Sequence, residues 1–296
     1  MNKPSYFVAE IDLKLAEKLR ADLLSQGFEL SSPPHTVFAA KKKNISCTLY
    51  KSGKLTVQGK EKDPFIEFYL EPEILGSLSF THPEVHLDLT PHIGLDEAGK
   101  GDFFGPLCVA AVFADGEGIK RLSQIGVRDS KKLSDRSIAL LAEKIRQAYP
   151  YTVIRLFPAK YNELYGKFKN LNRLLAWAHT AALHDLVQKT GCTEALIDQF
   201  AEPYVMQNAL TQKKLDVHLV HKIGGESDLV VAAASILARN GFVEGIHSLS
   251  TEWEMELPKG AGAPVTKAIG EFRNKWGVEA LNKVGKTHFK LFRELN

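Results

Sequence analysis

The chain has 296 residues, enough for two domains or one large one. Hydrophobic residues make up 44% of it and charged residues 25%, which is close to the soluble globular average and excludes wholesale disorder. The formal net charge of +3 is too small to indicate an anionic partner by itself. No uninterrupted apolar run reaches the roughly 18 residues of a membrane helix, so we expect no membrane association.

The N-terminal residues and the cysteines indicate a compartment. The first residues contain no apolar signal-peptide core, so export is not indicated. The three cysteines, Cys47, Cys108 and Cys192, lie far apart and form no CxxC pair. This usage argues against a disulfide framework and against a thiolate zinc site. We therefore expect a cytoplasmic protein.

The first 75 residues predict a small α+β unit. Leucines recur every four residues at 15, 19 and 23, as on one face of a helix. Asp63 before Pro64 is typical of a helix start, with a capping acid and proline at the first helical position. In chain order we expect a strand at 6–11, a helix from the cap Asp12 to Gly27, a hairpin at Ser46–Gln58 and a short helix opening at Asp63.

The hairpin region carries a run of basic residues. Between Phe38 and Lys60 there are six lysines and no acid: Lys41, Lys42, Lys43, Lys51, Lys54 and Lys60. Such a stripe could contact a phosphate backbone. A solvated hairpin face would explain it equally well.

A linker separates this unit from the rest of the chain. The stretch from Glu71 to Pro91 carries three prolines and little periodicity. We place the linker at 76–91, between an N-terminal domain at 1–75 and a larger domain at 92–296 with a C-terminal helical extension.

The larger domain predicts an α/β sheet with helices packed on its faces. It opens with a strand at Ile93–Glu97, a glycine-rich turn at 99–106 and an apolar strand at Leu107–Phe113. Strands and helices then alternate, which is typical of this class. We expect helices near 134–147 and 171–189 and from about Ser227, and strands at 151–157, 194–198 and 215–220.

Acidic residues end two of the apolar strands. Asp96 and Glu97 are adjacent at the end of the first, and Asp198 follows Ala195-Leu196-Ile197. A carboxylate at such a position is costly unless it is paired or binds a metal. If the two strands are neighbours, their carboxylates repel one another until a divalent cation neutralises them. Oxygen-only ligands suit Mg²⁺ or Mn²⁺. The alternative is that Asp96 pairs with a lysine and Asp198 caps a turn.

The glycine-rich turn does not match a nucleotide-binding loop. Gly99-Lys100 is followed by Gly101 rather than Ser or Thr, and the turn leads into a strand rather than a helix. Glycine does permit close approach of backbone N–H groups to a sugar-phosphate chain, with Lys100 as a cation beside them.

Four motifs together resemble those of the type 2 ribonucleases H. The first is Gly94-Leu95-Asp96-Glu97-Ala98-Gly99-Lys100-Gly101 with Phe104-Gly105-Pro106-Leu107, and the others follow in the family's order. They are Asp129-Ser130-Lys131-Lys132-Leu133, Ile197-Asp198-Gln199-Phe200 and Ala232-Ala233-Ala234-Ser235-Ile236-Leu237-Ala238-Arg239. The resemblance covers about residues 92–247. It implies a ribonuclease H-like fold, with a mixed central sheet flanked by helices.

Two features are more similar to the ribonuclease HIII branch than to ribonuclease HII. The turn reads Gly-Lys-Gly at 99–101, where ribonuclease HII usually has Gly-Arg-Gly. The additional N-terminal unit corresponds to the small domain of ribonuclease HIII, which resembles the TATA-box-binding protein fold and helps to hold the substrate. This gives the lysine stripe a purpose.

The resemblance implies a metal-dependent endonuclease that cuts the RNA strand of an RNA/DNA hybrid, leaving 5′-phosphate and 3′-hydroxyl ends. Asp96, Glu97 and Asp198 would be ligands of two Mg²⁺ or Mn²⁺ ions. Glu226 is the expected fourth acid, although its spacing to the following helix is one residue short, which leaves Asp228 as a rival. Gly99, Lys100, Gly101, Ser130 and Lys131 would contact the substrate beside these acids, and the N-terminal lysines would bind its phosphates.

Three alternatives stay open. Ribonuclease HII-type cleavage at single ribonucleotides in duplex DNA is the nearest, and a junction resolvase of the same fold is more distant. A non-catalytic hybrid-binding protein belongs to a different class, and the intact acids argue against it. We expect a monomer.

Overall fold

The computed structural model describes residues 6–76 and 87–293, without the side chains of Lys132, Glu226 and Arg293. The chain divides into two compact units, residues 1–87 and 88–296. Each is described by itself. Most of the predicted linker, at 77–86, lies outside the described residues.

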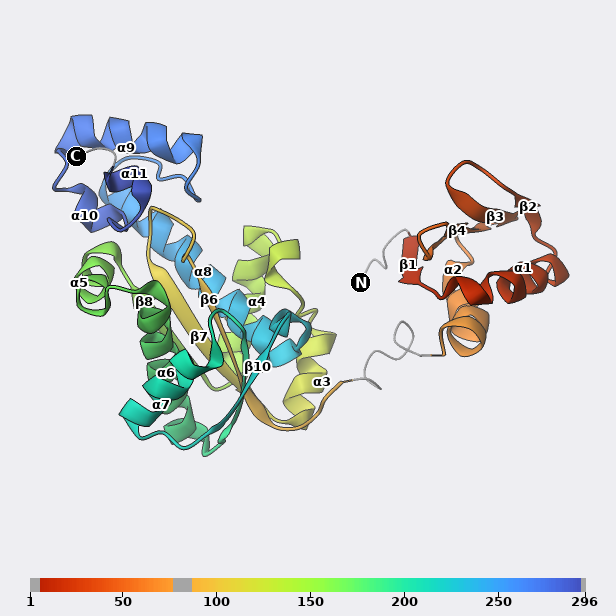
Figure 1. Ribbon diagram of the computed structural model, residues 1–296, viewed down its shortest axis with the longest axis horizontal. Helices are drawn as coiled ribbons and strands as arrows, with labels where there is room; N and C mark the ends of the chain where they lie inside the picture. The colour runs from red at the N-terminus through yellow and green to blue at the C-terminus, as the bar shows by residue number, and fades with distance from the viewer. Residues whose placement is uncertain (1–5, 77–86, 294–296) are drawn as a thin grey trace. The chain divides into compact units, whose positions relative to one another are not determined.

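The N-terminal unit is one antiparallel sheet of five strands covered by helices (Figure 1). The strand order is β1-β5-β4-β3-β2. The strands are β1 (Tyr6–Glu10), β2 (Glu29–Ser31), β3 (Thr36–Lys42), β4 (Ile45–Tyr50) and β5 (Lys54–Gln58). The predicted first strand and the hairpin are confirmed. The expected pattern lacked β2 and β3, because β2 has only three residues and because Val37 to Ala40 in β3 are all apolar, so the sequence does not alternate although burial along the strand does.

Alternation along β4 and β5 separates the two faces of this sheet. Cys47, Leu49 and Leu55 are fully buried, together with Leu19 and Leu23 of the helix α1 (Ala16–Ser25). Between them on the strands lie the half-buried polar residues Ser46, Thr48 and Thr56. One face therefore forms the core of the unit, and the other presents these hydroxyl side chains together with the exposed Tyr6 and Val8 of β1.

The end of this unit differs from the prediction. Asp12 caps a short 3₁₀ turn (η1, Leu13–Leu15) before α1, as expected for a helix start. However, α2 (Lys62–Phe65) begins one residue before Asp63, whose carboxylate accepts a hydrogen bond from the Lys62 ammonium rather than capping the helix. A π-helix, η2 (Ile66–Leu75), continues from it and ends just before the linker predicted at 76–91.

The second unit has a mixed sheet, as predicted, with the order β10-β9-β6-β7-β8. Its strands are β6 (His92–Ala98), β7 (Leu107–Ala114), β8 (Tyr151–Leu156), β9 (Glu194–Asp198) and β10 (His218–Lys222). β6, β9 and β10 are parallel, whereas β7 and β8 are antiparallel to their neighbours. β10 begins three residues later than expected, because the Leu215 N–H still closes the preceding helix on Leu210.

Helices cover both faces of this sheet (Figure 1). The apolar helix α8 (Leu229–Glu252) lies on one face, and α6 (Leu171–Thr190) packs with the core residues of the other. The predicted helices near 134–147, 171–189 and 227 are confirmed, whereas α3, α5 and α7 were not expected. The remaining helices are α3 (Gly116–Gln124), η4 (Ser130–Lys132), α4 (Asp135–Ala148), α5 (Pro158–Phe168), α7 (Pro203–Lys213), η5 (Gly225–Ser227), α9 (Ala263–Trp276), α10 (Leu281–Val284) and α11 (Lys290–Arg293).

Helix α8 lies directly against β6. A Cβ atom on Gly94 would be 2.3 Å from the Val230 carbonyl carbon and 2.4 Å from the Val231 nitrogen, so this contact requires glycine. By length and mean hydropathy α8 could cross a membrane, but 78% of its apolar window is buried inside this unit. The helix is therefore the central core element on its face of the sheet.

Candidate active site

Three of the predicted carboxylates meet at the ends of two neighbouring strands. β6 and β9 are parallel with Leu95 opposite Ile197, so Asp96 and Asp198 occupy the next positions on adjacent strands. Strand neighbours lie about 4.8 Å apart. Asp96, Glu97 and Asp198 all line one cleft with a volume of about 440 Å³. The expectation that the two strands are neighbours is confirmed.

Asp96 is held by two donors on the α8 side of the sheet. Its Oδ1 accepts the Glu97 backbone N–H at 2.8 Å, and its carboxylate also has a hydrogen bond with Ser235 of α8. Burial and the neighbouring Glu97 carboxylate raise the pKa of Asp96 to about 6. No lysine pairs with Asp96 among the contacts of the described residues. The charged form of such a carboxylate is stabilised when a cation binds at the site.

Glu97 points to the other side, as its adjacent position on the strand requires. Its side chain is only 5% exposed, and its two oxygens contact His179 Nε2 at 3.0 Å and the Lys100 ammonium at 2.7 Å. Burial opposes ionisation of Glu97, but His179 and Lys100 outweigh it and lower its pKa. The Glu97 carboxylate is therefore charged and fixed in orientation.

His179 is a site residue that the sequence did not identify. It lies on α6, is fully buried and stacks on Phe200 with a ring centroid distance of 5.2 Å. Because a carboxylate accepts, its Nε2 carries the proton toward Glu97. Its Nδ1 has no hydrogen-bond partner among the described residues. In the sequence it is one histidine in a mostly apolar helix, so no pattern marks it.

Asp198 is fixed by the loop that follows β10. Its Oδ1 accepts the Gly225 backbone N–H at 2.9 Å. A Cβ atom on Gly225 would lie 2.9 Å from the Asp198 Cα, so a side chain there would push the loop away. Glu226 follows directly in η5, next to this contact; its side chain lies outside the description.

Asp228, the rival of Glu226, is engaged elsewhere. It caps α8 by accepting the N–H groups of Val230 and Val231, and it pairs with His92 Nε2 at 3.1 Å. Burial opposes its ionisation, but His92 and the two N–H groups outweigh it and lower the pKa of Asp228. His92 lies four residues before Asp96, which corresponds to about 13 Å along the strand. Asp228 is not among the residues that line the cleft.

The three cleft acids suit a hard divalent cation. All their donor atoms are carboxylate oxygens, and burial together with the neighbouring Glu97 carboxylate raises the pKa of Asp96, so a cation would stabilise its charged form. Among the described side chains, no three acids, histidines or cysteines converge closely enough to enclose an ion. In this structure the Lys100 ammonium, whose side chain is half exposed, neutralises the Glu97 carboxylate. The residue types fit Mg²⁺ or Mn²⁺.

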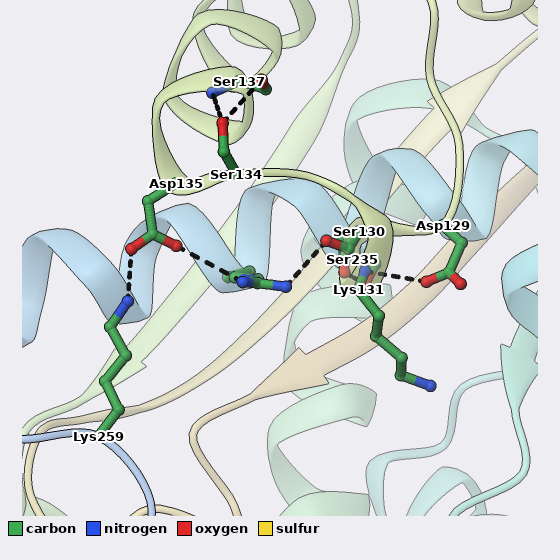
Figure 2. Close-up of polar contacts among 9 residues, drawn as sticks. Asp129, Ser130, Lys131, Ser134, Asp135, Ser137, Ser235 and Lys259 are labelled. Atoms are coloured by element: carbon green, nitrogen blue, oxygen red, sulfur yellow. Dashed lines mark hydrogen bonds and ion pairs between the residues drawn. The ribbon is translucent and has the colours of Figure 1, made fainter. Parts of the chain in front are cut away.

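A second polar network borders the cleft (Figure 2). Ser130 is buried, and its hydroxyl meets that of Ser235 at 2.8 Å, so hydroxyl groups link it to Asp96. Asp129 accepts the Lys131 N–H at 2.9 Å and caps the short η4 turn. Lys131 lines the cleft as well, and Figure 2 shows its side chain extending away from this network.

Two further cations line the cleft that the sequence did not assign to the site. Arg239 donates to the Ser130 carbonyl at 2.8 Å and contacts the Asp135 carboxylate at 3.5 Å. The Lys259 ammonium reaches the other Asp135 oxygen at 2.5 Å (Figure 2). Arg239 ends the fourth motif, and Lys259 stands in Leu257-Pro258-Lys259-Gly260, but neither residue is marked by strand position or charge pattern.

The glycine-rich turn reaches the same cleft. Gly99 and Lys100 line it, and Gly99 has a φ of 86°, with its Cβ position blocked 2.3 Å from the Pro106 carbonyl oxygen. Nothing lies within 4 Å of a Cβ on Gly101. The turn therefore needs glycine at 99, whereas the space at Gly101 is open.

The N-terminal lysines form two groups rather than one stripe. The group of Lys41, Lys42, Lys43 and Lys60 surrounds the β3–β4 turn, and Lys51 and Lys54 lie at the opposite end of β4. All six are exposed. The Lys42 ammonium donates to the Gln26 carbonyl at 2.8 Å and lies 5.8 Å from the Phe28 ring centroid.

Known proteins match the chain over nearly its whole length. A family model described as ribonuclease HII matches residues 93–292, and one described as a domain of unknown function (DUF3378) matches residues 6–77. The ribonuclease HIII of Protochlamydia amoebophila is 53% identical over 96% of this chain and 94% of its own length. That of Chlamydia pneumoniae is 50% identical over 99% and 98%.

A solved structure agrees. The crystal structure of Bst-RNase HIII in complex with Mn²⁺ covers 98% of this chain and 97% of its own, with 29% identity and a TM-score of 0.69. The predicted ribonuclease H-like fold is thereby confirmed. With its two units and with cleft acids at the ends of adjoining strands, the chain belongs to the ribonuclease HIII family.

Proposed function

We propose that the protein is an endonuclease that hydrolyses the RNA strand of RNA/DNA hybrids, leaving 5′-phosphate and 3′-hydroxyl ends. One observation carries this conclusion: Asp96, Glu97 and Asp198 line a single cleft from adjacent parallel strands. Ribonuclease HIII relatives that are 53% and 50% identical to this chain support the substrate class. Hydrolysis of a phosphodiester needs charge neutralisation where the phosphate binds.

The acids are the proposed ligands of two divalent cations, Mg²⁺ or Mn²⁺. When bound, such ions lower the pKa of the attacking water and stabilise charge on the leaving 3′-oxygen. The chain's own residues fix the ligands in advance. The Glu97 N–H and Ser235 orient Asp96, His179 orients Glu97, and the Gly225 N–H orients Asp198. Preorganisation of this kind is a major source of catalytic effect.

Glu226 is the proposed fourth acid. Its backbone follows Gly225, whose N–H already contacts Asp198. The rival Asp228 instead caps α8 and pairs with His92. Removing Asp228 from those partners would leave the His92 Nε2 and two helix N–H groups without their acceptor, which is costly in a partly buried position. These contacts favour Glu226.

Groups around the cleft are proposed to recognise the RNA strand and its sugar-phosphate chain. RNA differs from DNA in its 2′-hydroxyl, which both donates and accepts hydrogen bonds. The Gly99–Gly101 turn and Lys100 are proposed to meet the sugar-phosphate chain beside the acids, with Ser130 and Lys131 on the other border. Because its hydroxyl is buried against Ser235, Ser130 is proposed to act through its backbone. Arg239 and Lys259 add two cations for phosphates on that side.

The N-terminal unit is the proposed hybrid-binding domain, at residues 1–75, joined by the linker 76–91 to the catalytic domain at 92–296 with its C-terminal helical extension. Its likeness to the TATA-box-binding protein fold remains a prediction. The exposed Lys41, Lys42, Lys43, Lys51, Lys54 and Lys60 are the proposed phosphate contacts. We further propose a cytoplasmic monomer.

The decisive experiment compares three substrates. An RNA/DNA hybrid, a DNA duplex with one ribonucleotide and a four-way DNA junction are each incubated with Mg²⁺ or Mn²⁺. We expect cleavage of the hybrid by the wild type and none by Asp198→Asn. Preferred cleavage at the lone ribonucleotide would favour ribonuclease HII-type activity, cleavage of the junction would favour a resolvase, and tight hybrid binding without any product would favour a non-catalytic role.

A further inference from the structure

A fully buried lysine lies behind the cleft, and none of the roles above uses it. Lys286 has no exposed surface and follows α10 in the C-terminal part of the chain. Burial lowers its pKa to about 7, although the nearby Asp102 carboxylate raises it. A buried amino group costs free energy unless its N–H groups find acceptors. Its partners therefore indicate its purpose.

All three acceptors belong to the turn between β6 and β7. Lys286 Nζ donates to the backbone carbonyls of Gly105 at 2.7 Å, Asp102 at 2.8 Å and Phe104 at 3.4 Å. An ammonium has three N–H donors, so this set uses all of them. The side chain thus satisfies backbone carbonyls of the turn, including that of Asp102, which itself lines the cleft.

The backbone of the C-terminal segment binds the same turn. The Lys286 N–H donates to the Phe103 carbonyl at 2.9 Å, and the Gly105 N–H donates to the Val284 carbonyl at 3.0 Å. An isolated β-bridge joins Phe104 to Gly285. In Figure 1, α10 and α11 lie beside this end of the sheet. The outer half of the turn, from Asp102 to Gly105, is therefore held by residues near the C-terminus.

The segment is in turn anchored to α5. The Asn162 carboxamide accepts the Thr287 N–H at 3.0 Å and donates to the carbonyls of Gly285 at 2.9 Å and Asn282 at 3.1 Å. These bonds hold the backbone on both sides of Lys286. Movement of the turn would break this arrangement or displace the whole segment.

We propose that Lys286 is a positioning residue that fixes the β6–β7 turn from behind, and so sets where Gly99–Gly101 meet the sugar-phosphate chain of the hybrid. Fixing the turn is a property of the free protein. The effect on the hybrid rests on the proposed function. Lys286 has no contact with Asp96, Glu97 or Asp198, and it acts through the backbone carbonyls of Asp102, Phe104 and Gly105.

Hydrogen exchange of the free protein tests the first part. The variants are Lys286→Met, which keeps the length of the side chain without its donors, and Asn162→Ala, which loosens the segment from α5. Val284→Ala is the matched control, because it removes buried apolar atoms from the same segment and leaves the polar contacts in place. We expect amides of residues 99–105 to exchange at least tenfold faster in both test variants, with β9 and α6 unchanged, and no local effect in the control.

Unchanged exchange at 99–105 in Asn162→Ala and in any folded Lys286→Met would overturn the proposal, as would an equal local effect in Val284→Ala. If Lys286→Met does not fold, Asn162→Ala alone decides. The second part is measured by cleavage of a hybrid. We expect KM to rise about tenfold, whereas the Mg²⁺ concentration for half-maximal activity stays at the wild-type value. An unchanged KM despite faster local exchange would refute the substrate part. Absence of hybrid cleavage by the wild type would refute the proposed function and leave the exchange result standing.

Discussion

Gly94→Ala tests how closely α8 must approach the catalytic strand. The added Cβ would stand 2.3 Å from the Val230 carbonyl carbon and 2.4 Å from the Val231 nitrogen, both backbone atoms. Ordinary contacts of this kind are about 3.5 Å or longer, so helix and strand must separate by about 1 Å. Overpacking of a rigid core costs about 1–3 kcal/mol. Near the upper limit, the melting temperature of a unit of this size falls by about 6–12 °C.

The same displacement would reach the cleft. Ser235, on the same helix, forms hydrogen bonds with both Asp96 and Ser130. A 1 Å error in the position of a catalytic group can reduce a rate by about 100-fold. We expect kcat for an RNA/DNA hybrid at saturating Mg²⁺ to fall at least tenfold at 25 °C, where the variant is still folded.

Thermal unfolding and steady-state cleavage of the purified variant provide both measurements. Gly166→Ala is the matched control, since Gly166 lies in α5 with nothing within 4 Å of its Cβ position. Replacing that helical glycine should stabilise the protein by about 0.5–1 kcal/mol and leave kcat unchanged. A Gly94→Ala protein with wild-type melting temperature and wild-type kcat would refute the packing argument.

Four further predictions concern the acids and the N-terminal unit. Asp198→Asn should abolish cleavage without lowering the melting temperature of the metal-free protein, because the amide keeps the shape and accepts the Gly225 N–H; substantial turnover at saturating Mg²⁺ would contradict the two-metal proposal. Glu226→Gln should reduce kcat strongly and raise the metal concentration required, whereas Asp228→Asn should mainly lower stability by about 1 kcal/mol; metal titrations of both variants decide, and the opposite pattern would exchange the two roles. Burial opposes protonation of His92, but its hydrogen bonds to Asp228 and Thr90 outweigh burial and raise the pKa of His92, whereas the pKa of Asp228 is lowered. The pair therefore stabilises the fold most between about pH 4 and 6.5. This contribution to the free energy of unfolding declines as pH rises through the raised pKa of His92. Urea unfolding of the wild type and His92→Gln should show the difference shrinking above pH 7, and a constant difference would exclude the linkage. Deletion of residues 1–80 should raise KM far more than it lowers kcat. It should also reduce the slope of log binding constant against log salt concentration by about 0.9 for each lost phosphate contact. An unchanged KM and an unchanged slope would show that the lysines do not bind the substrate.

The sequence predicted those site residues that are acids at the ends of apolar strands. Asp96, Glu97 and Asp198 stand out because charges end apolar strands, whereas the pairing of β6 with β9 entered that reasoning only as a condition, which the structure meets. Residues that act through tertiary contact carry no such signal. His179 reaches Glu97 from a helix that starts far along the chain, and the Lys286 contacts span more than 180 residues of sequence.

The errors in the fold have similar causes. Strand β3 was not expected because Val37 to Ala40 form a continuous apolar run that is followed by two lysines, so its sequence lacks the polar–apolar alternation of a half-buried strand. The late start of β10 reflects Lys214, which ends α7 in the left-handed conformation and so extends the helix closure into Leu215. Local propensity does not contain the pairing partner that decides where a strand begins.

The continuity of α8 has a consequence for how the gene can change. The helix begins at the Asp228 cap, contacts Gly94 at Val230, reaches Asp96 through Ser235, packs against Gly99 with Phe242 and lines the cleft as far as Val243. Each residue turns a helix by about 100°. One codon inserted between Val231 and Ser235 would therefore rotate every later contact out of register, whereas an equal insertion beyond Val243 would leave these contacts in place. We expect length variation in related sequences to be excluded from the first half of α8 and tolerated only toward its C-terminal end.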